Sequence, residues 1–223
     1  MTQDSFRHIY ETLFDAFGPQ HWWPGRTPLE ICVGAILTQN TAWSNVEKAI
    51  ANLRAARKLS VRGLNRMAES ECADLIRPAG YFNVKTRRLK NFTRMLERDF
   101  GSSLKRLARL KTMEIRYRLL DVNGIGQETA DSILLYALDK PVFVVDAYTR
   151  RIFSRHGLIS GAETYDEIQA MFRERLPADR QLYNEFHALI VTTGKQFCRR
   201  TPRCGECPLR GCANRTRQYK EKQ

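Results

Sequence analysis

Apolar residues recur every three or four positions along almost the whole chain, which is the spacing of one face of an α-helix. The first two runs are Phe6, Ile9, Tyr10, Leu13, Phe14 and Phe17, followed by Leu29, Val33, Ile36 and Leu37. Further runs, separated by glycine, proline and serine, predict helices over residues 42–53, 62–68, 71–76, 87–100, 113–122, 128–138, 146–156, 165–176 and 180–194. Residues 142–145 form a short apolar run that fits a strand or a buried connector equally well. The pattern therefore predicts an all-α protein without a sheet.

The balance of charged residues narrows the class of binding partner. The chain has 37 lysines and arginines against 24 aspartates and glutamates, which leaves a formal net charge of +13 on 223 residues. Such an excess favours a polyanion as the partner. Because 43% of the residues are hydrophobic, the chain can bury a core and form one or two domains. No apolar run reaches the length of a membrane span, so membrane binding is not expected.

Four cysteines near the end of the chain form a compact pattern. Cys198, Cys204, Cys207 and Cys212 follow the spacing C-x5-C-x2-C-x4-C in a basic segment that contains proline. No apolar run surrounds them, so burial in a core does not explain all four. Two disulfides are one alternative, but the chain opens without an apolar signal segment, which favours a reducing cytoplasm. The pattern therefore predicts a metal centre over residues 198–212.

Two metal centres suit four thiolates: a tetrahedral zinc ion and a [4Fe-4S] cluster. A zinc ribbon usually has two well-separated C-x2-C pairs, whereas here one such pair is bracketed by single cysteines. The number and spacing of the ligands therefore favour the [4Fe-4S] cluster, and zinc stays the alternative.

Two features in the middle of the chain are candidates for chemistry. Gly124-Ile125-Gly126 joins two predicted helices, where glycines allow a tight turn and the next helix N-terminus attracts a backbone phosphate. An ordinary turn between helices is the alternative. Asp146 follows the apolar run and opens the next predicted helix, so it is either a functional carboxylate or a plain N-cap.

The order of the hairpin, the aspartate and the four-cysteine segment resembles the helix-hairpin-helix superfamily of base-excision DNA glycosylases, and the endonuclease III group in particular. The resemblance covers nearly the whole chain. It implies that Asp146 is the catalytic carboxylate and that residues 124–126 anchor duplex DNA that contains a damaged base. It also implies two helical lobes, a six-helix domain of residues 29–139 and a discontinuous domain of residues 1–28 with 140–223, which carries the iron-sulfur loop.

The chain departs from that group in two places. Bifunctional members carry a lysine where this chain has Glu128, and a carboxylate cannot form the Schiff base needed for strand cleavage. The resemblance therefore implies a monofunctional glycosylase, unless Lys140 or Lys195 supplies the missing amine. The first and last cysteine intervals are each one residue shorter than the usual C-x6-C-x2-C-x5-C, and retention of all four thiols still favours a metal.

All three tryptophans lie in one stretch near the start of the chain. Trp22-Trp23-Pro24 and the Leu-Thr-Gln-Asn-Thr run before Trp43 resemble the 3-methyladenine DNA glycosylase branch, which also has a glutamate at the position of Glu128. Indole rings stack well on electron-poor alkylated purines, some of which are cationic. These five residues are therefore expected to form the base pocket, with core packing as the alternative for each tryptophan.

Four polar residues are expected to contact DNA. Gln39 and Asn40 either fill the gap left by the extruded base or cap a turn. Lys85 and Arg88 belong to a glycine-tyrosine-lysine turn similar to that of the family, with a solvated basic face as the alternative. His187 is assigned no catalytic role, because helix packing is enough to explain it.

Three functions remain open on the sequence alone. The first is removal of an alkylated purine, such as 3-methyladenine or 7-methylguanine, by hydrolysis of the bond between base and sugar. The second is a glycosylase for oxidised pyrimidines or for uracil or thymine mismatches. The third is a non-catalytic protein that binds DNA structures. The expected protein is a monomer in the cytoplasm, associated with the nucleoid.

Overall fold

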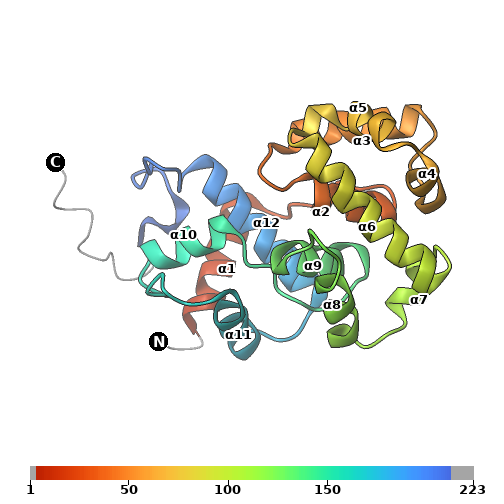
Figure 1. Ribbon diagram of the computed structural model, residues 1–223. Coiled ribbons are helices and arrows are strands. Elements are labelled where there is room, and N and C mark those ends of the chain that lie inside the picture. The colour runs from red at the N-terminus through yellow and green to blue at the C-terminus, as the bar shows by residue number, and fades with distance from the viewer. Residues whose placement is uncertain (1–3, 212–223) are drawn as a thin grey trace. The chain divides into compact units, whose positions relative to one another are not determined.

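Residues 4–211 are described by the computed structural model, and they form helices joined by short loops (Figure 1). No strand occurs among these residues, so the all-α prediction is confirmed for the described part of the chain. The chain divides into two compact units, Met1–Trp22 with Pro141–Gln223, which we call the terminal unit, and Trp23–Lys140, which we call the central unit. The predicted divisions lie after residues 28 and 139.

The central unit is built around one apolar helix. Its helices are α2 (Pro28–Leu37), α3 (Trp43–Ala55), α4 (Val61–Arg66), α5 (Glu69–Leu75), η1 (Arg77–Ala79), α6 (Phe82–Phe100), α7 (Leu104–Ala108), α8 (Thr112–Leu120), α9 (Gln127–Ser132) and η2 (Ile133–Ala137). Thr27 caps the N-terminus of α2, because its side chain accepts a hydrogen bond from the backbone N of Glu30. It packs against α3, α6 and η2, so it is apolar around most of its circumference.

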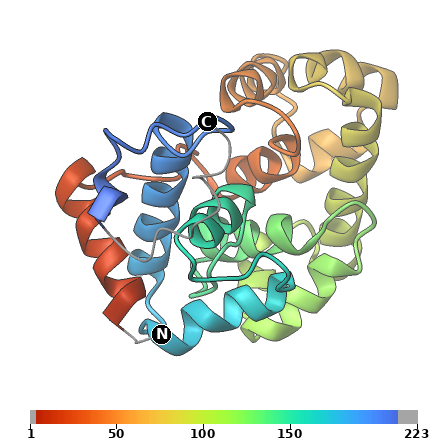
Figure 2. The same cartoon turned by 90° about the vertical axis from the view of Figure 1, so that its left-hand side faces the viewer.

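The terminal unit joins the first helix of the chain to the last ones. Its helices are α1 (Asp4–Phe17), α10 (Ala147–Arg155), α11 (Tyr165–Arg175), α12 (Arg180–Gln196) and η3 (Pro208–Gly211). Helices α1 and α12 lie side by side (Figures 1 and 2), and aromatic rings from several helices fill the core between them. The Phe6 ring, for example, lies 5.0 Å from Phe153 and 4.9 Å from Phe172, measured between ring centroids.

The short apolar run before α10 is a buried connector. Phe143, Val144 and Val145 are each 1% exposed, and the backbone N of Val145 donates to the hydroxyl of Tyr165 at 3.3 Å. Gln169 donates from its side chain to the carbonyl of Phe143 at 2.7 Å. Side chains of α11 thus supply hydrogen bonds that a neighbouring strand would otherwise supply.

Several helices differ from the sequence prediction, and three of the differences have a clear local description. Helix α6 begins at Phe82, five positions earlier than predicted, directly after Tyr81 in a left-handed conformation with φ of 46°. The predicted helix over 128–138 changes from α9 into the π-helix η2 at Ile133. Helix α7 was not predicted, because Leu107 is its one buried residue and the segment therefore shows no apolar period. Within residues 4–211, no helix combines the length and apolarity that a bilayer crossing requires.

Candidate functional site

Asp146 lies where the buried connector ends and α10 begins. Its Oδ1 accepts hydrogen bonds from the backbone N of Thr149 at 2.7 Å and from Thr149 Oγ1 at 2.9 Å, so it caps the helix. The residue is only 9% exposed. The apolar connector and the helix cap together hold one carboxylate at a fixed point on the terminal unit.

The other carboxylate oxygen of Asp146 faces a histidine on α12. Asp146 Oδ2 lies 3.6 Å from Nε2 of His187, a distance that marks an electrostatic contact and is too long for a good hydrogen bond. Burial alone would raise the pKa of Asp146, but His187 and the hydrogen bonds from Thr149 outweigh burial and hold the pKa below its ordinary value. The carboxylate is therefore ionised at neutral pH although it is buried.

A glycine brings α10 and α12 close together beside this pair. Gly194 lies two turns after His187, so the two residues project from the same face of α12. A Cβ atom at Gly194 would lie 2.2 Å from Cδ1 of Tyr148. The Tyr148 ring therefore packs directly on the backbone of α12, which fixes α10 and its cap relative to His187.

Lys195 and Trp22 form a cation–π pair on the terminal unit. Lys195 Nζ lies 5.4 Å from the centroid of the Trp22 ring. The segment before the tryptophan is tethered to α12, because the backbone N of Gln20 donates to Glu185 Oε1 at 2.6 Å and Thr192 Oγ1 donates to Gln20 Oε1 at 2.9 Å. Three residues of α12 therefore hold Trp22 in place.

The two glycines of the hairpin between α8 and α9 have different roles. Gly124 has φ of 95°, and a Cβ there would lie 2.3 Å from Cγ of Arg88, so the fold requires glycine. Gly126 has φ of −92°, and no atom lies within 4 Å of the position that its Cβ would take. An open backbone of this kind suits a ligand that approaches closely. Ile125 is 5% exposed, so any contact at this position involves its backbone.

A buried ion pair fixes the two helices of the hairpin against each other. Arg116 on α8 donates from Nε to Asp131 Oδ1 at 2.8 Å and from Nη2 to Asp131 Oδ2 at 3.2 Å. Asp131 on α9 is fully buried. Two parallel hydrogen bonds to one carboxylate set both the distance and the orientation of the helices.

The turn after α2 is bonded to the hairpin through Gln39. Gln39 Nε2 donates to the carbonyl of Gly124 at 3.3 Å and to Thr129 Oγ1 at 2.9 Å, and Gln39 Oε1 accepts from Arg88. Asn40 follows with φ of 54° and is exposed; asparagine tolerates this left-handed conformation better than most residues. The structure therefore brings Gln39, Asn40 and Arg88 together with the hairpin.

The prediction that Lys85 contacts a DNA phosphate is wrong for this conformation. Lys85 is 1% exposed, and its Nζ donates to the carbonyls of Leu37 at 2.8 Å and Ala79 at 2.7 Å. Burial, together with repulsion from Arg88, lowers the pKa of Lys85 to about 8. The side chain is directed inward because it binds carbonyl groups at the ends of α2 and η1.

The predicted base-pocket residues are divided between the two units. Trp22 lies on the terminal unit, whereas the rings of Trp23 and Trp43 meet edge to face on the central unit, with centroids 5.1 Å apart. Tyr136 joins them, its ring 4.9 Å from Trp23. A Cβ at Gly34 would lie 3.2 Å from the Trp43 ring, so a glycine on α2 makes room for the cluster. The remaining two pocket candidates, Pro24 and Glu128, are exposed on the central unit.

The segment after α12 contains three of the four predicted metal ligands. Cys198 and Cys207 are buried and Cys204 is exposed, and none of these three is in a disulfide, whereas Cys212 lies outside the described residues. Among residues 4–211, no group of three or more histidine, cysteine, aspartate or glutamate side chains is arranged to hold a metal ion. Cysteine thiols have the donor chemistry that a [4Fe-4S] cluster or zinc needs, and the site itself stays a prediction.

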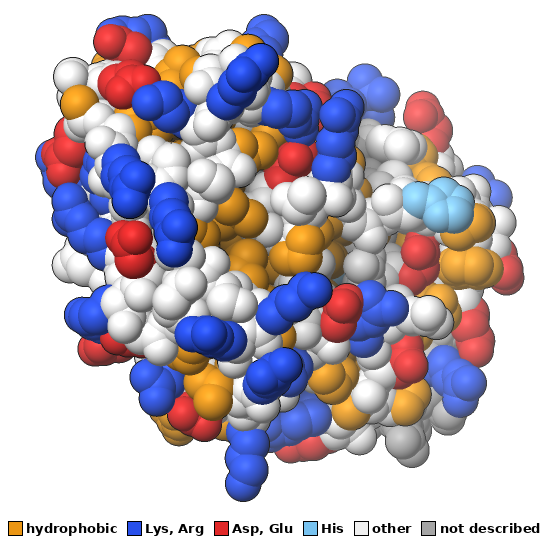
Figure 3. Space-filling view, turned by 90° about the vertical axis from the view of Figure 1, so that its right-hand side faces the viewer, with side chains coloured by type: hydrophobic (Ala, Val, Ile, Leu, Met, Phe, Trp, Pro, Cys, Tyr) orange, Lys and Arg blue, Asp and Glu red, His pale blue; other side chains and the backbone are white. Residues whose placement is uncertain are grey.

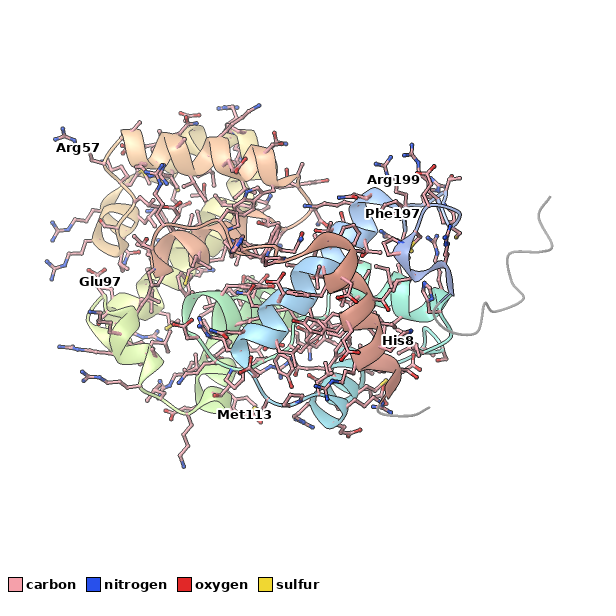
Figure 4. All side chains as sticks on the ribbon, turned by 180° about the vertical axis from the view of Figure 1, so that it is seen from behind. His8, Arg57, Glu97, Met113, Phe197 and Arg199 are labelled. Carbon is pink, nitrogen blue, oxygen red and sulfur yellow. The ribbon has the colours of Figure 1, made fainter. Side chains whose placement is uncertain are left out.

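Two arginines of α10 hold the beginning of the cysteine segment, near Arg199 in Figure 4. Arg151 Nε donates to the carbonyl of Cys198 at 2.6 Å. Arg155 Nη1 donates to Cys198 Sγ at 3.2 Å and to the carbonyl of Arg199 at 2.6 Å. The helix that begins at the candidate carboxylate therefore ends against the cysteine segment.

Sequence reasoning missed two contributors to these sites. His187 was assigned no role, although its position two turns before a glycine on one helix face was an available signal. Nothing in the sequence shows that this face meets α10. Tyr136 was missed because its apolar surroundings predict an ordinary core residue.

Known proteins similar to the chain point to one family. The model of the HhH-GPD superfamily of base excision DNA repair proteins matches residues 33–178. A protein of Methanocaldococcus jannaschii with the working name DNA repair glycosylase is 49% identical over 203 residues, which cover 91% of this chain and 92% of that protein.

Two solved structures are similar in fold. The 3-methyladenine DNA glycosylase of H. pylori, bound to 1,N6-ethenoadenine, has a TM-score of 0.72 and 32% identity, and the match covers 86% of this chain and 97% of that one. An endonuclease III–DNA complex has a TM-score of 0.82 over 96% of both chains, but at 20% identity it shows the fold alone. Together with the family match, these findings show that the chain belongs to the HhH-GPD superfamily of base excision DNA repair proteins.

Proposed function

We propose that this DNA repair glycosylase is monofunctional and removes alkylated purines from duplex DNA by hydrolysis. The observation that carries the proposal is the buried Asp146 carboxylate, which is kept ionised at the start of α10 and faces His187. A fixed negative charge of this kind is what an oxocarbenium-like transition state requires.

Asp146 would act on the sugar of the extruded nucleotide. As the bond between base and sugar breaks, positive charge develops on the sugar, and the ionised carboxylate stabilises that charge and orients the attacking water. Thr149 holds the carboxylate through two hydrogen bonds, so little reorganisation is needed at the moment of reaction. His187 favours the ionised form of Asp146.

DNA binding would involve the hairpin and the basic surface. Gly126 leaves its backbone open for a phosphate, and lysine and arginine side chains are scattered over the face shown in Figure 3 and outnumber the acidic ones there. Extrusion of a base costs a few kcal/mol, which contacts to the flanking backbones offset. The net charge of +13 supplies the attraction.

The absence of strand cleavage follows from Glu128. This exposed residue occupies the first turn of α9, where bifunctional relatives of the endonuclease III group carry a lysine, and a carboxylate forms no Schiff base. If Lys195 or Lys140 formed a Schiff base in place of the lysine of the bifunctional relatives, borohydride reduction during the reaction would trap the protein on the DNA. We expect no trapped complex with the wild-type protein.

The choice of an alkylated purine is supported by the likeness to the H. pylori enzyme, at 32% identity, and by the aromatic cluster of Trp23, Trp43 and Tyr136. Indole and phenol rings offer electron-rich faces to electron-poor bases. A panel of oxidised pyrimidines and mismatched uracil or thymine distinguishes this proposal from the endonuclease III type of substrate.

We also propose that Cys198, Cys204, Cys207 and Cys212 hold a [4Fe-4S] cluster. Such a cluster would cross-link the end of α12 to the segment that follows it, and Arg155 would donate a hydrogen bond to one ligand sulfur. Iron and acid-labile sulfide in the anaerobically purified protein would support it. A content of one zinc per chain without sulfide would instead show that the four cysteines form a zinc site.

Incubation with methylated duplex DNA tests the main proposal. The wild type should release 3-methyladenine or 7-methylguanine, and strands should break only after later alkali treatment. Asp146→Asn should reduce the rate by at least about 100-fold with duplex binding retained. Asp179→Asn is the matched control, because Asp179 caps α12 in the same way, with Oδ1 accepting from the N of Leu182 at 2.7 Å. Release by Asp146→Asn at the wild-type rate would exclude this mechanism.

A further inference from the structure

The side chain of Gln39 makes three hydrogen bonds that join separate elements of the central unit. Its two N–H groups reach the carbonyl of Gly124 and the hydroxyl of Thr129, which are 85 and 90 positions away in sequence. Its oxygen accepts from Arg88 on α6. One amide thus connects the turn after α2 with the hairpin, the first turn of α9 and α6.

The same turn is fixed from its other side. Lys85 donates to the carbonyl of Leu37 at 2.8 Å, and Thr38 Oγ1 donates to the carbonyl of Gly34 at 2.6 Å. The backbone N of Thr41 donates to the carbonyl of Thr38 at 3.2 Å and closes the turn. The ends of the turn are therefore held by these bonds, and Gln39 between them is bonded to the hairpin.

Asn40 is the member of this turn that faces outward. It is exposed and has φ of 54°, whereas Gln39 beside it is directed to the hairpin. Asparagine adopts this left-handed conformation more readily than most residues, so the turn holds Asn40 without much strain. Asn40 is therefore exposed directly beside a residue that is bonded to the hairpin.

We propose that Gln39 is a positioning residue that couples contact of DNA with the 124–126 hairpin to the placement of Asn40 against the same DNA. The inference rests on the proposed function only in that both elements meet DNA. Contact at Gly126 fixes the hairpin, the hairpin carbonyl of Gly124 holds the Gln39 amide, and the amide fixes the turn. Without the amide, the hairpin and Asn40 bind DNA independently.

Three substitutions separate these contributions. Gln39→Leu keeps similar volume and removes all three hydrogen bonds. Asn40→Gly removes the side chain and still permits the left-handed conformation. Gly126→Ala adds a Cβ that meets no atom within 4 Å in the protein, at a φ that alanine adopts, so it obstructs the ligand and leaves the fold intact.

The test is a double-mutant cycle between Asn40→Gly and Gly126→Ala, measured as the Kd for a duplex with a stable tetrahydrofuran abasic analogue. In the wild-type background, the loss of affinity in the double variant should differ by fivefold or more from the product of the two single losses. In the Gln39→Leu background, the loss in the double variant should equal the product of the two single losses within twofold. A merely structural role would lower stability and leave this coupling unchanged.

Asn52→Leu is the matched control, because Asn52 also donates from a side-chain amide to a distant carbonyl in the central unit, that of Leu75 at 2.9 Å. The coupling should survive in that background, and urea unfolding should show that both leucine variants are folded under the conditions of the binding assay. Equal coupling with and without Gln39, or none in the wild type, would overturn the proposal. The binding measurement does not require base release. If the protein shows the coupling but releases no damaged base, the proposed reaction is refuted and the proposed role of Gln39 is not.

Discussion

Asp146 has two physical roles in one side chain, as the cap of α10 and as a buried charge near His187. Asparagine keeps the cap acceptor and loses the charge, whereas alanine loses both. We therefore expect Asp146→Ala to be less stable than Asp146→Asn by about 0.5–2 kcal/mol, with base release lost to the same extent in both. Urea unfolding at neutral pH measures the difference. Equal stability of the two variants would show that the cap contributes nothing.

The lowered pKa of Asp146 also gives the folding stability a pH dependence. Between the lowered pKa of the folded state and the ordinary Asp value of about 3.9, the unfolded chain binds more protons, so stability rises with pH. The contribution is complete above the ordinary value and is lost as pH falls through the folded pKa. The stability gap between the wild type and Asp146→Asn should therefore shrink on acidification. A gap that is independent of pH would contradict the assigned direction.

Lys85 gives the folding stability a second pH dependence, in the alkaline range. Its pKa is lowered to about 8, so between pH 8 and the ordinary lysine value of about 10.4 the folded protein releases a proton that the unfolded chain retains. Stability attributable to Lys85 should rise over that range. Urea unfolding of the wild type and Lys85→Met at several pH values isolates the effect, because other titrating groups are shared. Parallel pH curves would show that the ammonium is not desolvated.

At the scale of elements, the buried Arg116–Asp131 pair joins the two helices of the hairpin. Arg116→Met leaves Asp131 without its cation in a fully buried place, which should cost about 3–5 kcal/mol. Arg118→Met on the same helix is the control, because its pair with Glu114 is exposed and worth less than about 1 kcal/mol. Chemical denaturation compares the two. Similar losses for both variants would mean that the buried pair is not special.

The whole molecule carries a charge of +13, and its affinity for DNA should follow from it. Each neutralised phosphate contributes about −0.9 to the slope of log K against log salt. We expect log K for undamaged duplex to decrease linearly with log salt between about 50 and 200 mM. The slope should correspond to about four or more neutralised phosphates. Asp146→Asn should have the same slope. A slope near zero would show that the excess charge is not used for DNA.

Local features of the fold were readable in the sequence because they arise within a few residues. Apolar spacing located most helices, and the apolar run before Asp146 placed that residue at the start of α10. The same logic failed at α7, where one buried leucine gives no period, and at η2, where the turn widens without any change in hydrophobicity. Helix ends and turn widths depend on neighbouring elements that local spacing does not record.

The sequence by itself determined the helical class, the positive charge, the hairpin glycines and the residue types available for chemistry. Tertiary structure alone decided that Gln39 binds the hairpin, that His187 meets Asp146, and that Lys85 is directed inward. The physical reason is one of range. A helix, a cap or a turn is specified by interactions within about four residues, whereas a contact between distant residues depends on how all the helices pack.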